Sequence, residues 1–507
     1  MNNKRIKSTK STQKPKKHKP DPFFSGDKPR RKQKHASDDD SIKSSDSEDE
    51  EYGEKALADV ADVDGGGDVD VEETAGEKRK RMAEAYLEKM REMARREIEE
   101  GDDDDDVAGG GDVEERVGRM LHKQQMEDSG RARRLIAKSV QKPKTTDEFR
   151  FLVKHRQSVT AVVLSEDDST GFSASKDGYI IQWDVETGKT QPYVWPSEEV
   201  LRSHGANELQ GKAKKRSKHV LALAVSSDGR YLASGGFDRH IHLWDTRTRE
   251  HIQAFKGHKG PVSCLTFRQG TSELFSGSYD RTIKLWNAED RAFVHTLFGH
   301  QSDVLTIDCL RKERLLTVGR DRTMHLWKVP EESQLVFRAP ASSLECCCFI
   351  SDDEFLSGSD DGSVEHWSVM RKKPLHIIKN AHPLLTPNNL ENNGQNDDLP
   401  NGDLNHAPES VCSSAHSWVG SVAVCRGTDL AASGAGNGMV RLWEIENDTK
   451  GVKPLFELPL VGYVNSLAFA KSGKFLVAGV GKEPRLGRWG SLPTARHGVA
   501  IHPLHLS

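Results

Sequence analysis

The chain has 507 residues, of which 35% are hydrophobic and 30% charged, and its formal net charge is −4. This length allows several domains or one large repeat array. The net charge is close to zero, which excludes a uniformly basic or acidic protein. No apolar run approaches the roughly 20 residues that cross a bilayer, and no secretory signal is found at the N-terminus, so we expect an intracellular protein.

Residues 1–74 separate their charges into two blocks. Lys and Arg crowd the stretch up to about Ala36, whereas Asp and Glu crowd the stretch from Ser37 to Glu73. Blocks of like charge repel themselves and bury little surface, so we expect a disordered tail. Ser37, Ser45 and Ser47 each have an acidic residue three positions downstream, which is typical of casein kinase two substrates.

Two basic clusters in this tail predict a two-part nuclear import signal, with a general nucleic-acid-binding arm as the alternative. The basic residues are Lys14, Lys16, Lys17, Lys19, Lys28, Arg30, Arg31, Lys32 and Lys34.

Residues 75–140 predict charged helices, one over 75–100 and a second over 113–140, separated by an acidic, Gly-rich break. In the first, Met82, Tyr86, Met90 and Met93 recur at helical spacing among strong helix formers. Two interpretations stay open: solvated helices with weak apolar stripes, or helices that dock on a partner or along the side of the domain that follows.

From about Thr145 the chain consists of short β-rich runs that recur at the roughly 40–45-residue period of WD-type propeller blades. Its clearest unit contains His258, Ser276, Asp280 and Trp286. We expect the Asp, in the turn between the second and third strands, to bind the His, and the Ser to link that His to the indole. Such charged hydrogen bonds contribute roughly 1.5–3 kcal/mol each. The pattern predicts an all-β fold, a seven-bladed WD-repeat β-propeller over 145–507.

The other units follow the same pattern less and less closely. The expected sets are His155, Ser173, Asp177 and Trp183 in the first unit; His219, Ser234, Asp238 and Trp244 in the second; His300, Thr317, Asp321 and Trp327 in the fourth; Ser357, Asp361 and Trp367 in the fifth; His416, Ser433 and Trp443 in the sixth, with Asn437 in place of Asp; and only Trp489 in the seventh. Inserts are expected at 194–218 and 379–411, the second as a disordered loop. The last outer strand is expected from Glu148–Val153 or from His497–Leu504, and the choice stays open.

No catalytic or metal site is predicted, so we expect no enzyme and no cofactor. The repeated His, Ser and Asp resemble a hydrolase triad in composition, but they recur with each blade and each set ends at a Trp. "GVGKE" (Gly479–Glu483) lacks both the first Gly and the Ser or Thr of a phosphate loop. The seven cysteines lack the paired spacing of a zinc site, and we interpret them as reduced thiols, mostly in strands; they are Cys264, Cys309, Cys346, Cys347, Cys348, Cys412 and Cys425.

Two basic features predict binding of a polyanion. Arg follows the turn Asp in three successive blades, at Arg239, Arg281 and Arg322, with Arg320 beside the last, so that one rim of the ring could carry a basic arc. Simple solvation of the turns is the alternative. The insert before the second blade is almost wholly cationic at Lys212, Lys214, Lys215, Arg216 and Lys218, and contacts of this kind give RNA affinity with little sequence choice.

A different function is indicated by Trp244, Asp245 and Arg247, a W-D-x-R arrangement like the one by which propeller receptors dock on a cullin-type ubiquitin ligase. Many propellers carry this arrangement by chance, and fold alone does not choose between the two roles.

Two stretches go beyond what a propeller needs, "WKVPEESQLVF" (Trp327–Phe337) and "LPLVGYVNSLAFAKSGKFLVAGVGKEPRLGRWG" (Leu458–Gly490). With "LFGHQSDVLTID" and "SDDGSVEHW", they closely resemble the WD-repeat protein family of the U3 small nucleolar ribonucleoprotein, over about Arg134 to the last residue.

The resemblance implies a non-enzymatic, RNA-binding protein of the nucleus and nucleolus. Its partners would be the box B/C element of U3 small nucleolar RNA, the box C/D core proteins with their kink-turn binder, and the small-subunit processome that releases 18S RNA. We expect a monomer within that particle and no membrane contact. The resemblance identifies no individual RNA contact.

Overall fold

The computed structural model describes residues 75–99, 113–128, 133–143, 148–206, 218–340, 343–383, 417–446 and 451–506. The predicted import signal, the candidate phosphorylation sites Ser37, Ser45 and Ser47, the basic residues 212–216 and His416 lie outside these ranges. The chain divides into two compact units, Met1–Met120 and Leu121–Ser507. No helix in the described ranges is both long and apolar enough to cross a membrane.

The first unit contains α1 (Ala75–Glu99) and the start of α2 (Val113–Asp128). The Arg91 guanidinium of α1 forms an ion pair with Glu114 of α2, with Nε and Oε1 3.0 Å apart. Met90, Ala94 and Val117 are buried, whereas Met93 of the expected apolar stripe is 37% exposed.

The helix expected over 113–140 is too long. It ends at Asp128, and residues 133–143 contain only the 3-10 turn η3 (Ala137–Ser139) between extended residues. At Ile136 and Ala137 the backbone N–H groups donate to Oδ1 of Asp429, at 2.8 and 2.9 Å. They are therefore not available for the hydrogen bonds of an α-helix.

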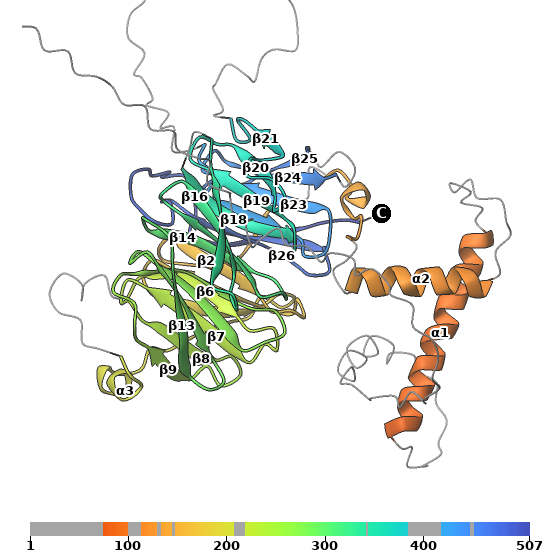
Figure 1. Cartoon of the computed structure of the whole chain (residues 1–507), viewed down its shortest axis with the longest axis horizontal. Coiled ribbons are helices and arrows are strands. Elements are labelled where there is room, and N and C mark those ends of the chain that lie inside the picture. The colour runs from red at the N-terminus through yellow and green to blue at the C-terminus, as the bar shows by residue number, and fades with distance from the viewer. Residues whose placement is uncertain are drawn as a thin grey trace, which may run out of the picture. The chain divides into compact units, whose positions relative to one another are not determined.

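The second unit is the predicted seven-bladed β-propeller, built from seven four-stranded antiparallel sheets (Figure 1). In chain order the strands are β1 (Arg150–Lys154), β2 (Val159–Leu164), β3 (Thr170–Ser175), β4 (Ile180–Asp184), β5 (Thr190–Pro192), β6 (Val220–Val225), β7 (Tyr231–Gly236), β8 (Ile241–Asp245), β9 (His251–Phe255), β10 (Val262–Phe267), β11 (Glu273–Ser278), β12 (Thr282–Asn287), β13 (Ala292–Phe298), β14 (Val304–Cys309), β15 (Arg314–Gly319), β16 (Thr323–Lys328), β17 (Ser333–Arg338), β18 (Leu344–Ser351), β19 (Glu354–Ser359), β20 (Val364–Ser368), β21 (His376–Ile378), β22 (Ser421–Val424), β23 (Leu430–Gly434), β24 (Met439–Ile445), β25 (Val452–Pro459), β26 (Tyr463–Phe469), β27 (Phe475–Gly481) and β28 (Gly498–Pro503). A short helix, α3 (Glu198–Ser203), lies between β5 and β6.

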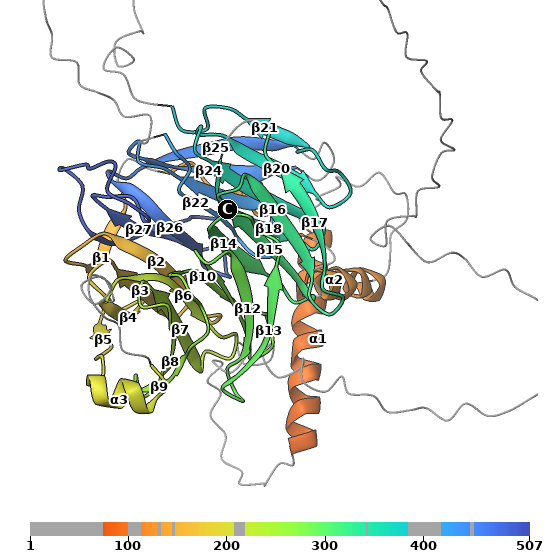
Figure 2. The same cartoon turned by 60° about the vertical axis from the view of Figure 1, so that its left-hand side comes forward.

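Blade 7 closes the ring with strands from both ends of the propeller. Blades 1 to 6 each use four consecutive strands, from β2–β5 to β22–β25, whereas blade 7 has the order β26-β27-β28-β1. Figure 2 shows β1 on the same side of the ring as β26 and β27. Both segments left open by the sequence therefore belong to this blade, and the earlier one, β1, is its outer strand, paired with β28 from Arg150↔Ile501 to Lys154↔Gly498.

The hydrophobic core lies between neighbouring blades. A single buried cluster joins Phe275 of blade 3 to Val304 and Trp327 of blade 4, and similar clusters follow around the ring. The third strands of blades 1 to 6 each contribute a Trp that is at most 2% exposed: Trp183, Trp244, Trp286, Trp327, Trp367 and Trp443.

Inner strands are also joined by hydrogen bonds at a repeated β-bulge. The extra residue of the bulge is Thr160, Ser263 or Asn465 in three blades, and its side chain donates to a backbone carbonyl of the next inner strand, as from Asn465 to Val159 at 2.8 Å. The bulge residue of blade 5 is Glu345. Within the described residues Glu345 makes no such bond, and the carbonyl of Val419 in the next blade accepts from the Cys346 thiol instead.

The two edges of the ring differ in what they carry. Because successive strands are antiparallel, the links between blades and the turns between second and third strands lie on one edge, which we call the linker rim. The opposite edge carries the segment 133–143, which we call the strap, and is named the strap rim. The strap pairs Arg134 with Thr428 and Val140 with Leu506, and Arg133 forms an ion pair with Glu354.

Candidate nucleic-acid interface

The linker rim holds the polar networks that fix its own turns. In blade 3, His258 contacts Asp280 through Nδ1 at 2.9 Å and Ser276 through Nε2 at 2.8 Å, and the Trp286 indole donates to Ser276 at 2.8 Å. His300, Thr317, Asp321 and Trp327 repeat this arrangement in blade 4. The hydrogen bond and the charge of the His hold the pKa of Asp280 well below its usual range, against the opposing effect of burial.

Blade 2 corrects the expected role of His219. Asp238 contacts His242 of β8 instead, and a chain of imidazoles continues from His242 to His251 at 2.9 Å and to His204 at 2.8 Å. His219 lies edge-on against Phe237. The preceding insert displaces the usual link between blades, and Trp195 from that insert packs on Trp244 at 5.0 Å between ring centroids.

In blade 6 the network is complete, but its histidine is His382 and not His416. His382 is fully buried and bonds Ser433 at 2.8 Å and Asn437 at 3.3 Å, and the Trp443 indole donates to Ser433. Burial lowers the pKa of His382 to about 4, so it is neutral and pairs with a neutral Asn without an unpaired charge. The long insert separates His382 from its blade in the sequence, which hides the relation.

Blades 1 and 5 keep part of the set. In blade 1, His155 bonds Ser173 at 2.9 Å, but the Trp183 indole N–H has no partner in the described residues. In blade 5, the Trp367 indole donates to Ser357, whose hydroxyl donates to the buried Glu365 carboxylate at 3.2 Å. Asp361 accepts hydrogen bonds from its own turn, from Ser359 and the Ser363 N–H.

Trp489 is not the repeat Trp of blade 7. It lies in the connection between β27 and β28 and is 47% exposed. His502 takes the position in the sheet, because it pairs with Leu476 as Trp286 pairs with Leu274, and it is 1% exposed.

His300, Asp321 and His325 are the group within the described ranges whose ligand atoms are close enough for a metal ion. Their atoms already have partners: the His300 nitrogens contact Asp321 and Thr317, and those of His325 contact Gln334 and Thr323. The three residues therefore lie close together because they belong to the hydrogen-bond network of blade 4.

The predicted basic arc lies on the linker rim. Arg239, Arg281 and Arg322 occupy the same turn position in blades 2, 3 and 4, with φ of 68°, 69° and 62°. All three are exposed, and none forms an ion pair within the described residues. Arg320 is also exposed but contacts Asp303 at 3.3 Å. Blades 1, 5 and 6 have Gly at this position, in the same left-handed conformation: Gly178, Gly362 and Gly438.

Left-handed backbone costs an L-residue roughly 1–2 kcal/mol and costs Gly almost nothing. Three neighbouring turns thus carry Arg where Gly would be less strained. Arg249 and Arg291 have the same backbone conformation in turns of the strap rim, so the distinctive feature of the arc is its position in successive turns of one rim.

The basic insert leaves and rejoins the ring at the same rim. It runs from β5 to β6, and only its ends are described, including α3 and the exposed Lys218. The backbone carbonyl of Lys218 lies directly against Gly178 in the blade 1 turn. The described end of the insert and the arc therefore lie on the same rim, a relation the sequence did not show.

A further group on this rim escaped the sequence analysis: the cap, residues 482–497, which connects β27 to β28 across the mouth of the central channel. Buried Lys176 of blade 1 holds it by an ion pair with Glu483 at 3.1 Å and a bond to the Gly487 carbonyl. On the far side of the channel, Arg485 donates to the Leu305 carbonyl of blade 4 at 2.7 Å. The cap includes the "KEPRLGRWG" part of the stretch that carried the family resemblance.

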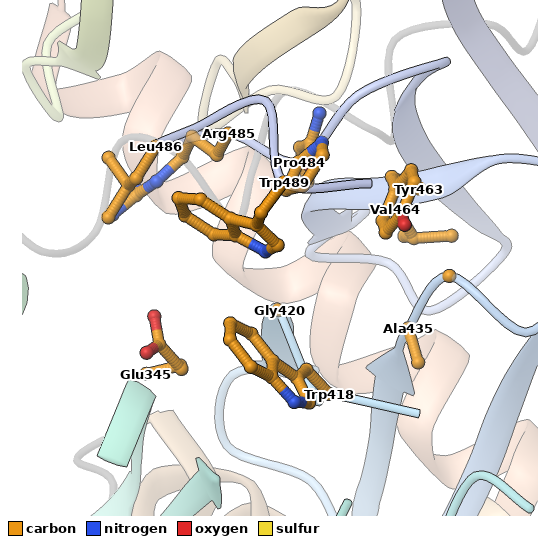
Figure 3. A pocket seen from close by; sticks show the side chains of 12 residues that line it. Glu345, Trp418, Gly420, Ala435, Tyr463, Val464, Pro484, Arg485, Leu486 and Trp489 are labelled. Atoms are coloured by element: carbon orange, nitrogen blue, oxygen red, sulfur yellow. The ribbon is translucent and has the colours of Figure 1, made fainter. Parts of the chain in front are cut away.

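Beneath the cap a small pocket opens between the indoles of Trp418 and Trp489, which are 5.7 Å apart and inclined by 45° (Figure 3). Glu345, Tyr463 and Arg485 also line it. The glycines of the cap make this packing possible, because a Cβ on Gly487 would lie 1.6 Å from the Trp489 ring and a Cβ on Gly490 2.0 Å from the Tyr463 hydroxyl.

The central channel, with a cavity of about 160 Å³, is lined by the inner strands of all seven blades and by Arg485. Its cysteines, Cys264, Cys346 and Cys347, have their pKa values raised by burial, so they are poor nucleophiles and metal ligands.

Arg247, the residue of the alternative ligase motif, is exposed in the turn after β8, on the strap rim. Its backbone N–H donates to Asp245 at 2.8 Å and helps to close that turn, which is a sufficient structural role for the pair.

Comparison with known proteins identifies the repeats. The family model "WD domain, G-beta repeat" matches residues 147–184, 209–245, 249–287, 291–328, 331–368 and 409–444. The chain is 66% identical over 394 residues to "U3 snoRNP-associated protein-like YAOH" of Oryza sativa subsp. japonica, covering 77% of this chain and 75% of that protein. It is 39% identical over 435 residues to the human "U3 small nucleolar RNA-interacting protein 2", covering 86% and 83%.

A solved structure described as "Crystal structure of RRP9 WD40 repeats" superposes with a TM-score of 0.61 and 40% identity, covering 72% of this chain and 99% of that one. The predicted family and propeller fold are thereby confirmed, and none of these relatives favours the ubiquitin-ligase alternative.

Proposed function

The chain belongs to the WD-repeat family of U3 small nucleolar ribonucleoprotein-associated proteins, and from this membership we propose that it is an RNA-binding scaffold of that particle in precursor ribosomal RNA processing. A protein of this particle works in the nucleus and nucleolus, and the basic clusters of the N-terminal tail would serve its import. The propeller architecture and the names of the relatives support a role without catalysis.

One observation supports RNA binding most directly: three neighbouring turns of the linker rim hold exposed Arg residues in strained backbone, on the rim where the basic insert rejoins the ring. None of the three forms an ion pair with another residue of the described ranges. Guanidinium groups at fixed spacing on a rigid rim suit phosphates along an RNA backbone. The arc residues Arg239, Arg281, Arg320 and Arg322 and the insert residues Lys212, Lys214, Lys215, Arg216 and Lys218 are our candidate RNA contacts.

The finer proposal follows from the family. The RNA would be the box B/C element of U3, bound beside the kink-turn binder among the box C/D core proteins, and the particle would act within the small-subunit processome in 18S maturation. The chain would enter this particle as a single copy.

Titration of the full chain with a fluorescent box B/C hairpin tests the proposal. We expect binding that weakens steeply with salt and that exceeds binding of a scrambled hairpin of the same length and composition. Equal affinity for the two hairpins would contradict the proposal that the box B/C element is the RNA recognised. Absence of binding to both at low salt would remove RNA binding altogether.

A further inference from the structure

The pocket under the cap has a composition that the basic arc does not explain. Two partly exposed indoles, a tyrosine ring and one carboxylate converge at the channel mouth, and Figure 3 shows the Glu345 side chain beside both Trp418 and Trp489. Trp489 exposes 47% of its surface, a large apolar area to leave in water.

Glu345 is the residue that makes the pocket unusual. In three other blades the equivalent bulge residue is a donor that fastens the next inner strand, whereas an ionised carboxylate has no hydrogen to donate. Within the described residues no hydrogen bond or ion pair satisfies its oxygens. The blade 5 contact to Val419 is made by Cys346, so Glu345 is not needed to hold the ring together.

Charges on three elements face this carboxylate. Burial raises the pKa of Glu345 to about 7, and Asp360 of the β19–β20 turn adds to that effect, whereas Arg320 of the β15–β16 turn and Arg485 of the cap oppose it. Arg320 already contacts Asp303, and Arg485 points to the Leu305 carbonyl. A half-buried carboxylate without a direct partner among the described residues is stabilised by a cation that enters the pocket.

The size of the pocket limits what can enter. Its cavity is about 40 Å³, and one water needs roughly 10–15 Å³, so about three or four small heavy atoms fit. A purine ring is too large. A guanidinium group has four heavy atoms, is planar, stacks on indole faces and pairs with carboxylates through two N–H groups.

We propose that the pocket formed by Glu345, Trp418 and Trp489 binds an arginine side chain of a partner protein. The guanidinium contacts the indole pair and donates to Glu345, while the backbone of the partner segment crosses the cap. The site shares only the neighbouring Arg320 with the RNA contacts proposed above, and arginine binding there does not require RNA binding.

The experiment uses the full chain labelled with ¹⁵N-tryptophan, whose nine indole N–H signals are assigned at the pocket by Trp418→Phe and Trp489→Phe. The probe is a blocked pentapeptide with one arginine between glycines. The matched probe contains citrulline, which has nearly the same shape without the charge. Glu289→Gln, in an exposed turn of blade 3, is the control for Glu345→Gln.

We expect the arginine peptide to shift the Trp418 and Trp489 signals with saturation, and the citrulline peptide to shift them at least tenfold more weakly. Glu345→Gln should weaken binding at least fivefold with a melting temperature no lower than that of wild type, and Glu289→Gln should have no effect. Since the ionised fraction of a carboxyl with a pKa of about 7 rises roughly tenfold from pH 6 to pH 8, affinity should rise by a similar factor in wild type and stay flat in Glu345→Gln.

Equal shifts with arginine and citrulline, or no loss in Glu345→Gln, would overturn the proposal. Shifts produced by guanosine monophosphate but not by the peptide would assign the pocket to a nucleobase and equally overturn it. Because no RNA is present, a negative result leaves the RNA proposal intact, and failure of hairpin binding leaves this one intact.

Discussion

Replacing the three arc residues Arg239, Arg281 and Arg322 by glycine separates RNA contact from structure more cleanly than alanine would. Glycine already occupies the same turn position in other blades, for example Gly178 and Gly362. Because each Arg has left-handed backbone, its replacement removes roughly 1 kcal/mol of strain per site, and the triple variant should unfold at a temperature no lower than that of wild type.

RNA binding should change in a calculable way. Each phosphate contact contributes about 0.7–0.9 to the slope of log affinity against log salt, so the loss of three contacts lowers the slope by about 2–3. Between 50 and 200 mM salt, wild-type affinity should then fall about 20- to 40-fold more than that of the triple variant. This is a large difference for three surface side chains.

Fluorescence anisotropy with the box B/C hairpin at four or five salt concentrations measures the slope. The control is Arg249→Gly with Arg291→Gly, since both have positive φ, at 61° and 55°, in turns on the strap rim. If the triple variant keeps the wild-type slope, or if the control lowers it equally, the linker rim is not the RNA face.

Three further predictions concern the ring and its cap. Asp429→Ala leaves the Ile136 and Ala137 N–H groups without their acceptor and should destabilise the propeller by about 2–4 kcal/mol in urea unfolding; a change below about 0.5 kcal/mol would show that the strap is not fastened there. Burial raises the pKa of Glu365 to about 7, so the folded state holds a proton that the unfolded state loses from about pH 4.5, and stability should fall as pH rises from 5 to 7 by at most about 3 kcal/mol. That part of the pH dependence should vanish in Glu365→Gln, and an identical profile in the variant would contradict the assignment. Gly487→Ala should displace the Trp489 ring, shift its indole signal and abolish arginine-peptide binding with little change in melting temperature, whereas an unmoved signal would refute the packing argument.

The fold could be predicted from the sequence because its signals are local and repeated. Ser276, Asp280 and Trp286 lie close together in the chain, and the same spacing recurs in the neighbouring blades. A motif contained in one hairpin and its turn is preserved wherever that hairpin folds.

The sequence-based predictions were wrong where the interacting residues are far apart in the chain, or where the local composition resembles the repeat motif. His382 serves blade 6 across a long insert, so the sequence pattern favours the nearer His416. Trp489 ends an apparently regular unit, yet the third strand of blade 7 begins only at Gly498. The second helix was extended to Val140 because its residues favour helix, but Asp429, almost 300 residues later, binds the N–H groups at this point.

The candidate site likewise combines features that local sequence predicts with features that follow only from the fold. Each Arg of the arc could be named from its turn, whereas its position beside the basic insert follows from the direction of strands in the ring. The pocket under the cap joins blades 5, 6 and 7, and no sequence spacing relates Glu345 to Trp418 and Trp489.

The way blade 7 is completed has a consequence for synthesis on the ribosome. The apolar strand β1 is made before any blade but has no partner until β28, beyond six finished blades, has been made. Throughout that interval the nascent chain presents an unpaired sheet edge, the feature that recruits chaperones or misassembles with other chains. A translational pause anywhere between β1 and β28 should therefore lower the yield of folded protein more than an equal pause before β1 has been made.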